Sequence, residues 1–171
     1  MTSSSEPRGR LLEAFNHLIL GRKQGRPALG EVIRNAGVAR STLYDHFGGR
    51  DDLLLEALKT PLRAMADVGA GNGEVQAVST MLEHFRSRRE DALDLLSGPL
   101  RYRINRTLAQ MMCKRNELLN EKSGIILAEV LFGFVRLWLA GETAQKPEIL
   151  AKLMIQGANA QRAFLLKMID C

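Results

Sequence analysis

Residues 40–50 hold a dense run of side chains that can hydrogen-bond to nucleic acid. A guanidinium can bind guanine O6 and N7 through two hydrogen bonds, hydroxyl groups can reach base edges or phosphates, and basic side chains can bind phosphates. The residues with these groups are Arg40, Ser41, Thr42, Tyr44, His46 and Arg50. We expect Arg40 to discriminate between bases, and His46 and Arg50 to contact backbone phosphates.

One carboxylate interrupts this run. Asp45 would be repelled by DNA, so it either accepts a hydrogen bond from a cytosine amine or pairs with an arginine of its own chain. Upstream, Arg8, Arg10 and Arg26 are expected to add phosphate contacts. Such contacts position a protein on DNA without reading its sequence.

The apolar residues around this run predict the elements that hold it. Apolar side chains recur at helical spacing at Val32, Ile33, Ala36, Val38, Leu43 and Phe47. Gly37 lies between the two segments, where a helix commonly ends in the left-handed conformation. Two short helices, at about 29–36 and 40–47, joined by a tight turn predict a helix-turn-helix, which presents the polar side chains of its second helix to a major groove.

The rest of the chain is helical in pattern as well. No stretch shows sustained alternation of apolar and polar residues, so we predict an all-α fold. A first helix is expected from Arg10 to about Lys23. A fourth runs from Asp51 to about Met65, with Pro61 as a kink or a boundary.

The glycine-rich segment Gly69–Gly73 is predicted to be a linker. Beyond it we expect helices at about 75–88, 90–96, 100–120, 122–140 and 147–169. The predicted organisation is a flexible arm at 1–9, a helix-turn-helix DNA-binding domain at 10–58 and a helical domain at 59–171.

Composition and length describe an ordinary globular protein. The 171 residues are 46% hydrophobic, and the net charge of +5 with a pI of about 9.6 permits an anionic partner without demonstrating one. The first ten residues lack the apolar core of a secretory signal. The apolar run Ile125–Ala140 falls short of the roughly 20 residues that a membrane span needs, and it contains Glu129 and Arg136.

Enzyme chemistry has no support in the sequence. His17, His46 and His84 lie far apart without metal-ligand spacing, and no nucleophile or phosphate-loop motif is present, so we expect no enzymatic activity, metal or cofactor. Cys113 and Cys171 make no disulfide framework and are expected to be reduced in a cytoplasmic protein. A redox role for Cys113, whose two basic neighbours could lower its pKa, is the alternative.

The segment Arg10–Leu58 resembles the N-terminal domain of the TetR-type (tetracycline-repressor-like) transcriptional regulators. The resemblance rests on three motifs in order: LLEAF at 11–15, AGVARSTLYDHF at 36–47 and GRDDLL at 49–54. It implies a three-helix DNA-binding domain whose third helix reads the operator.

The chain departs from the pattern of that family at three places. One is Arg50, which stands where a lysine is common and keeps the charge with a forked geometry suited to phosphate. Ala28-Leu29-Gly30 stands where a hydroxyl residue is usual, so we expect no phosphate contact there. Ala39 stands where a serine is usual, so Ser41 or a backbone amide is expected to cap the third helix.

The resemblance also implies that the helical domain at 59–171 is a regulatory and dimerisation domain. It would hold a small-molecule pocket, and its last two helices would form a four-helix bundle with a partner subunit. The pocket candidates, which fit a plain core equally well, are Met81, Phe85, Leu108, Met111, Met112 and Trp138. The interface candidates are Ile126, Val130, Phe134, Leu137, Leu153, Gly157 and Phe164. A solvated face, with an anionic effector as the alternative, is expected at Arg86, Arg88, Arg89, Arg101, Arg103 and Arg106.

The expected function is a homodimeric, sequence-specific repressor that binds double-stranded operator DNA. A small-molecule effector, whose identity the sequence does not indicate, would release it. The alternative is a helical regulator that acts through protein partners and has no small-molecule pocket. An enclosed apolar cavity with a few polar groups would favour the first, and a solid core the second.

Overall fold

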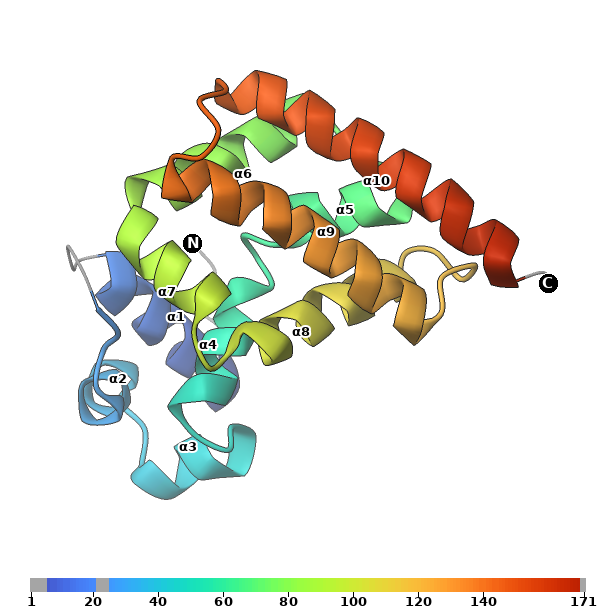
Figure 1. Cartoon of the computed structure of the whole chain (residues 1–171). Helices are drawn as coiled ribbons and strands as arrows, with labels where there is room; N and C mark the ends of the chain where they lie inside the picture. The colour runs from blue at the N-terminus through green and yellow to red at the C-terminus, as the bar shows by residue number, and fades with distance from the viewer. Residues whose placement is uncertain (1–5, 21–24, 170–171) are drawn as a thin grey trace. The chain divides into compact units, whose positions relative to one another are not determined.

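The computed structural model describes residues 6–20 and 25–169, and all regular secondary structure within them is helical (Figure 1). The all-α prediction is confirmed. The chain divides into two compact units, Met1–Leu58 and Lys59–Cys171. This division falls at the residue where the sequence analysis places the end of the DNA-binding domain.

The first unit is a small bundle built on its first helix. Its helices are α1 (Pro7–Leu20), α2 (Leu29–Ala36), α3 (Arg40–His46) and α4 (Arg50–Leu58). Helix α1 packs against the other three through Leu11 and Phe15, which are fully buried. The four helices therefore share one apolar core.

The N-terminal arm predicted at 1–9 is wrong at its inner end. Helix α1 begins at Pro7, because proline has no N–H to leave unsatisfied in the first turn of a helix and its φ suits that position. Residues 1–5 of the predicted arm lie outside the described residues. So do residues 21–24, where the first helix was expected to end.

The fourth helix is shorter than predicted. Helix α4 ends at Leu58, and α5 (Arg63–Ala70) begins after a turn that contains Pro61. Continuing α4 through this position would remove a backbone hydrogen bond and force the proline ring against the preceding turn. Pro61 is therefore in a boundary between two helices and does not kink one.

The second unit is formed by the remaining helices. They are α5, α6 (Val75–Ser87), α7 (Arg89–Ser97), α8 (Arg101–Cys113), α9 (Glu121–Ala140) and α10 (Pro147–Ile169). Helix α9 packs against α8 and α10, and α10 also packs against α5 and α6 (Figure 1). By length and composition α9 could cross a membrane, but half of its apolar window is buried inside this unit, as in the core helix of a globular domain.

The predicted linker at Gly69–Gly73 is wrong. Gly69 and Ala70 belong to α5, and Gly71 ends that helix in the left-handed conformation with φ of 105°. The guanidinium of Arg162 donates to the carbonyls of Val68 and Gly69, at 3.4 and 3.2 Å. The segment is thus the fixed end of a helix whose last carbonyls are capped from α10.

The interior beside this helix end is tightly filled. A Cβ built on Gly69 would lie 2.5 Å from Sδ of Met112, so α5 and α8 approach each other closely. The predicted helix at 100–120 is correspondingly shorter, since α8 ends at Cys113. Asn120 instead caps α9, where its side chain accepts from the amide of Ser123 at 2.9 Å.

Candidate nucleic-acid interface

Helix α3 is held to the first unit by its apolar side. Leu43 is fully buried and Phe47, directly after the helix, is 5% exposed. On α2, Val32 and Ala36 are buried as well. Because Leu43 and Phe47 lie one helical turn apart, they leave the opposite side of α3 facing solvent.

The turn between α2 and α3 has the geometry that the glycine predicted. Gly37 has φ of 61° and ψ of 41°, and the amide of Val38 donates to the carbonyl of Ile33 at 3.4 Å. The carbonyl of Gly37 accepts from the guanidinium of Arg10 on α1, at 3.5 Å. The turn is therefore closed by its own backbone and tied to α1.

The outer side of α3 carries the predicted site residues. Arg40, Ser41, Tyr44 and His46 are exposed, and Thr42 is half-buried. Residues one turn apart form three rows along the helix: 40 with 44, 41 with 45, and 42 with 46. The guanidinium of Arg40 lies 5.9 Å from the centre of the Tyr44 ring, so the ring supports the arginine.

Arg50 follows α3 after a glycine turn. Gly49 has φ of 149°, and the amide of Gly48 donates to the carboxylate of Asp52 at 2.9 Å. A Cβ on Gly48 would lie 2.5 Å from that carboxylate oxygen. The turn thus requires glycine and starts α4 at Arg50, which is exposed.

Two expectations about α3 concern its N-cap and the partner of Asp45. The N-cap is Ala39, and no side chain, that of Ser41 included, caps the helix. Asp45 is exposed and pairs with no arginine in the part of the chain that the structure describes. Its carboxylate therefore stands beside Ser41 in the middle row of the outer face.

The flanking arginines are occupied within the first unit. Arg8 pairs with Glu56 at 2.9 Å and lies over the Phe47 ring at 5.5 Å. Arg26 lies 3.7 Å from Asp51. Together with Arg10, they brace the helices, so the expectation that they contact phosphate finds no support in this geometry.

Sequence reasoning missed one basic residue of the first unit. Arg34 lies on the last turn of α2, is exposed, and has no carboxylate partner among the described residues. Arg40 and Arg50 share both properties. The signal for Arg34 was its place on the polar side of α2, between the buried Val32 and Ala36.

The six candidate pocket residues are all buried in the second unit: Met81, Phe85, Leu108, Met111, Met112 and Trp138. Of these, Trp138 lines an open pocket of about 350 Å³. Residues of α6, α7, α9 and the loop after α9 complete its wall, among them Arg86, Arg89 and Gln145. Sequence reasoning had assigned the arginines and the tryptophan to different groups.

Helix α9 leaves an apolar stripe exposed. Ile126 is 43% exposed and Leu137 is 52% exposed, and Val130 and Gly133 between them are half-buried. Their spacing of four, three and four residues keeps them on one side of the helix. Open space surrounds the position where a side chain of Gly133 would lie.

Helix α10 repeats this pattern. Leu153 is 40% exposed and Phe164 is 58% exposed, and Gly157 and Ala160 stand between them at the same spacing of four, three and four. A Cβ on Gly157 would lie 3.3 Å from the ring of Phe134, so this candidate pair already makes contact within one chain. The two stripes thus flank a close approach of α9 and α10.

Metal and thiol chemistry find no site among the described residues. No group of three or more His, Cys, Asp or Glu residues there could hold a metal ion. Burial raises the pKa of the Cys113 thiol, and the charge of Glu121 raises it further. The guanidinium of the neighbouring Arg115 is bound to Asp67 at 2.7 Å, so it does not activate this thiol.

Known proteins match this architecture. Residues 27–57, which include α2, α3 and most of α4, match the model of the family described as bacterial regulatory proteins, tetR family. The fold is similar to the crystal structure of TetR family repressor AlkX from Dietzia sp. strain DQ12-45-1b, implicated in biodegradation of n-alkanes. That match has 18% identity and a TM-score of 0.55, and covers 93% of this chain and 97% of the other.

No curated protein sequence matches the chain. At this low identity, the similarity to AlkX shows a shared fold and nothing more. The family match at 27–57, in contrast, falls on the helix-turn-helix itself. The match includes the two glycine turns and the polar face of α3 described above. Residues 27–57 of the chain therefore form a helix-turn-helix that is similar to that of the tetR family of bacterial regulatory proteins.

Proposed function

We propose that the chain is a homodimeric repressor whose two α3 helices read the two halves of a palindromic operator. The observation that carries the dimer is the pair of matching apolar stripes on α9 and α10, with Ile126 and Leu137 on one helix and Leu153 and Phe164 on the other. Monomers rarely expose contiguous apolar surface of this kind, and two such helices from each copy pack as a four-helix bundle.

Reading is assigned to the outer face of α3. Arg40 discriminates between bases, while Tyr44, His46 and Arg50 bind phosphate and position the helix. Asp45 and Ser41 form the middle row of this face, so Asp45 accepts from a base amine, of cytosine or adenine. Thr42 reaches base edges or phosphate from the third row.

Release by a small molecule is the regulatory half of the proposal. Binding among the helices of the second unit would shift α4 and change the spacing of the two α3 helices, so that they no longer match half-sites about 34–36 Å apart. The pocket beside Trp138 is open and not enclosed, but it offers a place for such a molecule. The interior beside Gly69 and Met112 is tightly filled. A filled core favours the alternative, a regulator that uses its apolar stripes to bind another protein.

Selection of bound duplexes from a random pool tests DNA reading and dimerisation together. A palindrome whose half-sites lie about one helical turn apart, 10–10.5 base pairs, is the expected result. A single asymmetric site would contradict the homodimer. Operator affinity is then measured with and without a panel of small molecules, and a protein that releases DNA for none of them but binds a partner protein through α9 and α10 would establish the alternative.

A further inference from the structure

We propose that the pocket beside Trp138 binds a small organic anion, a monocarboxylate with an apolar or aromatic body. This ligand would be the effector of the proposed function. Only the effect of its binding on operator release rests on that function. The pocket lies where α6 ends, α7 begins and α9 passes into the loop before α10. With a volume of about 350 Å³, it is near the lower end for small-molecule sites.

Two guanidinium groups give the pocket its charge. Arg86 is on the last turn of α6, Arg89 is the first residue of α7, and no carboxylate side chain is among the lining residues. The Nε of Arg89 donates to the carbonyl of Leu139, and its terminal N–H groups have no carboxylate partner among the described residues. A guanidinium presents paired donors that match the two oxygens of a carboxylate.

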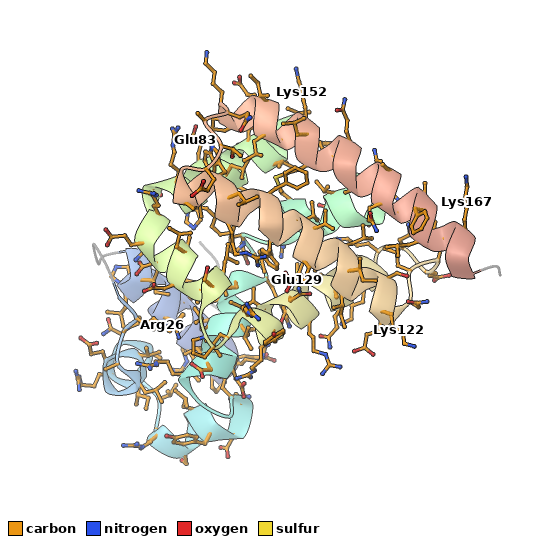
Figure 2. The ribbon with its side chains drawn as sticks, in the orientation of Figure 1. Arg26, Glu83, Lys122, Glu129, Lys152 and Lys167 are labelled. Atoms are coloured by element: carbon orange, nitrogen blue, oxygen red, sulfur yellow. The ribbon has the colours of Figure 1, made fainter. Side chains whose placement is uncertain are left out.

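Arg86 can exchange its present partner for a ligand. Its guanidinium is 2.6 Å from the carboxylate of Glu83, which Figure 2 labels on α6. The side chains of Arg86 and Glu83 are 56% and 49% exposed, and ion pairs this exposed contribute little net stability. A ligand carboxylate can therefore displace Glu83 from Arg86 without breaking a buried interaction.

Two helix C-termini, those of α6 and α9, bring opposing charge from the backbone to the pocket. The C-terminus of a helix carries partial negative charge on its last carbonyls. At the end of α9, three carbonyls already have donors, because Arg89 binds the carbonyl of Leu139, and the amides of Gly141 and Glu142 bind those of Trp138 and Leu137. At the end of α6, the carbonyls of His84 and Phe85 accept from the hydroxyl of Ser87 and the amide of Arg88. Arg86 and Arg89 therefore make the electrostatic potential in the pocket positive.

The indole gives the pocket its apolar surface. Trp138 is 9% exposed, and its Nε1 donates to the backbone carbonyl of Gln145 at 2.9 Å. With its N–H occupied, the ring offers carbon surface to a ligand, and Leu139 and Ala144 extend that surface. A charged end and an apolar body are needed together, which favours an organic carboxylate over free phosphate.

Trp138 is the only tryptophan of the chain, so fluorescence of the full-length protein reports directly on this pocket. The probes are benzoate, phenylacetate and hexanoate, with benzamide as the uncharged match to benzoate and inorganic phosphate as the anion without an apolar body. We expect a saturable change with the carboxylates and at least about tenfold weaker binding of benzamide and phosphate, since hydrogen bonds between charged groups are the stronger ones.

Variants of the exposed ion pair make the test specific. Arg86→Ala should raise the Kd for benzoate about tenfold, and Glu83→Gln should lower it, because Arg86 then loses its competing partner. Arg101→Ala is the matched control: Arg101 is exposed, lies over Tyr102 at 4.4 Å and does not line the pocket. Arg89→Lys, which keeps charge but loses the fork, should weaken binding without removing it. Circular dichroism checks that each variant is folded.

Several results would overturn the proposal: no saturable signal with any carboxylate, equal affinity for benzamide, or an unchanged Kd in both Arg86→Ala and Glu83→Gln. Because binding is measured without DNA, failure here is distinct from failure of the proposed function. Release of the operator by a compound that leaves Trp138 fluorescence unchanged would refute this site and keep the regulator. Carboxylate binding without any effect on operator affinity would keep the site and refute its role in release.

Discussion

At the scale of single residues, α3 separates the side chains that hold it from those proposed to read DNA. Leu43 and Phe47 are buried, while the three rows on the outside carry every candidate contact of the helix. Within these rows Arg40 and Tyr44 are physically coupled, because the guanidinium lies over the ring. Their substitutions should therefore not behave as independent changes.

Replacing Arg40 by alanine should relax base preference at one position of each half-site, with a loss of about 1–3 kcal/mol of discrimination. Tyr44→Phe keeps the ring beneath Arg40 and removes only the hydroxyl, so it should weaken binding to all sequences alike. Tyr44→Ala removes the support as well and should add a loss of base preference. Fluorescence anisotropy on single-base operator variants at fixed salt measures all three.

Arg50→Ala is the control for these substitutions. Arg50 is exposed beyond the end of α3, so its loss should weaken every operator variant equally and lower the salt-dependence slope by about 1. If Arg40→Ala, Tyr44→Phe and Arg50→Ala all relaxed base preference to the same degree, the division between reading and positioning would be refuted.

The polar side of α3 was predictable because residue type and helical spacing are both local properties. The roles of Arg8, Arg10 and Arg26 were not, because each is set by a partner on another helix or turn: Glu56, Gly37 or Asp51. For an arginine, the sequence near it does not distinguish a phosphate contact from an internal brace.

At the scale of elements, two glycines of the helix-turn-helix have opposite roles. Gly37 ends α2 with φ of 61° and has open space around its missing side chain, so Gly37→Ala should cost about 1–2 kcal/mol from backbone conformation alone. Gly30 is the second residue of α2, where a Cβ would make only an ordinary contact with Arg34, so Gly30→Ala should gain stability, by at most about 0.5–1 kcal/mol.

Chemical denaturation of both variants gives the free energies of unfolding. Because the same methyl group is added at each position, the sign of the difference isolates the backbone conformation. A stabilised Gly37→Ala variant would show that the turn can be made without a left-handed residue, which would contradict the geometry of this cap.

The periodicity of apolar residues predicted the all-α fold and most helix positions. The wrong predictions concerned the ends of helices. The glycine-rich segment at 69–73 has the composition of a linker, yet Arg162 and Asn116 cap its carbonyls from 93 and 46 residues away along the chain. No local pattern contains such partners. The pocket escaped prediction for the same reason, since its wall joins residues of α6, α7 and α9.

At the scale of the whole molecule, the two apolar stripes predict how the oligomer responds to charge. Leu137→Glu or Phe164→Glu should convert the dimer to monomers, because a carboxylate buried without a partner in the interface costs roughly 2–5 kcal/mol. Operator affinity should fall with it, since one helix-turn-helix then binds one half-site. Analytical ultracentrifugation gives the oligomeric state.

Lys152→Glu is the matched control for this prediction. Lys152 neighbours Leu153 in the chain, is exposed, and projects from α10 away from α9 (Figure 2). This charge reversal should leave the dimer and its operator affinity intact. If the wild-type chain is a monomer at micromolar concentration and binds its operator tightly, the stripes have another partner.

The way α3 is attached has a consequence for engineering. Its anchors, Leu43 and Phe47, are confined to one side of a helix of seven residues, and the turns at both ends are closed by glycine backbone. The outer positions 40–42 and 44–46 can then be exchanged as a cassette without disturbing the core. A hybrid made in this way would keep the second unit of this chain and take its operator preference from another regulator.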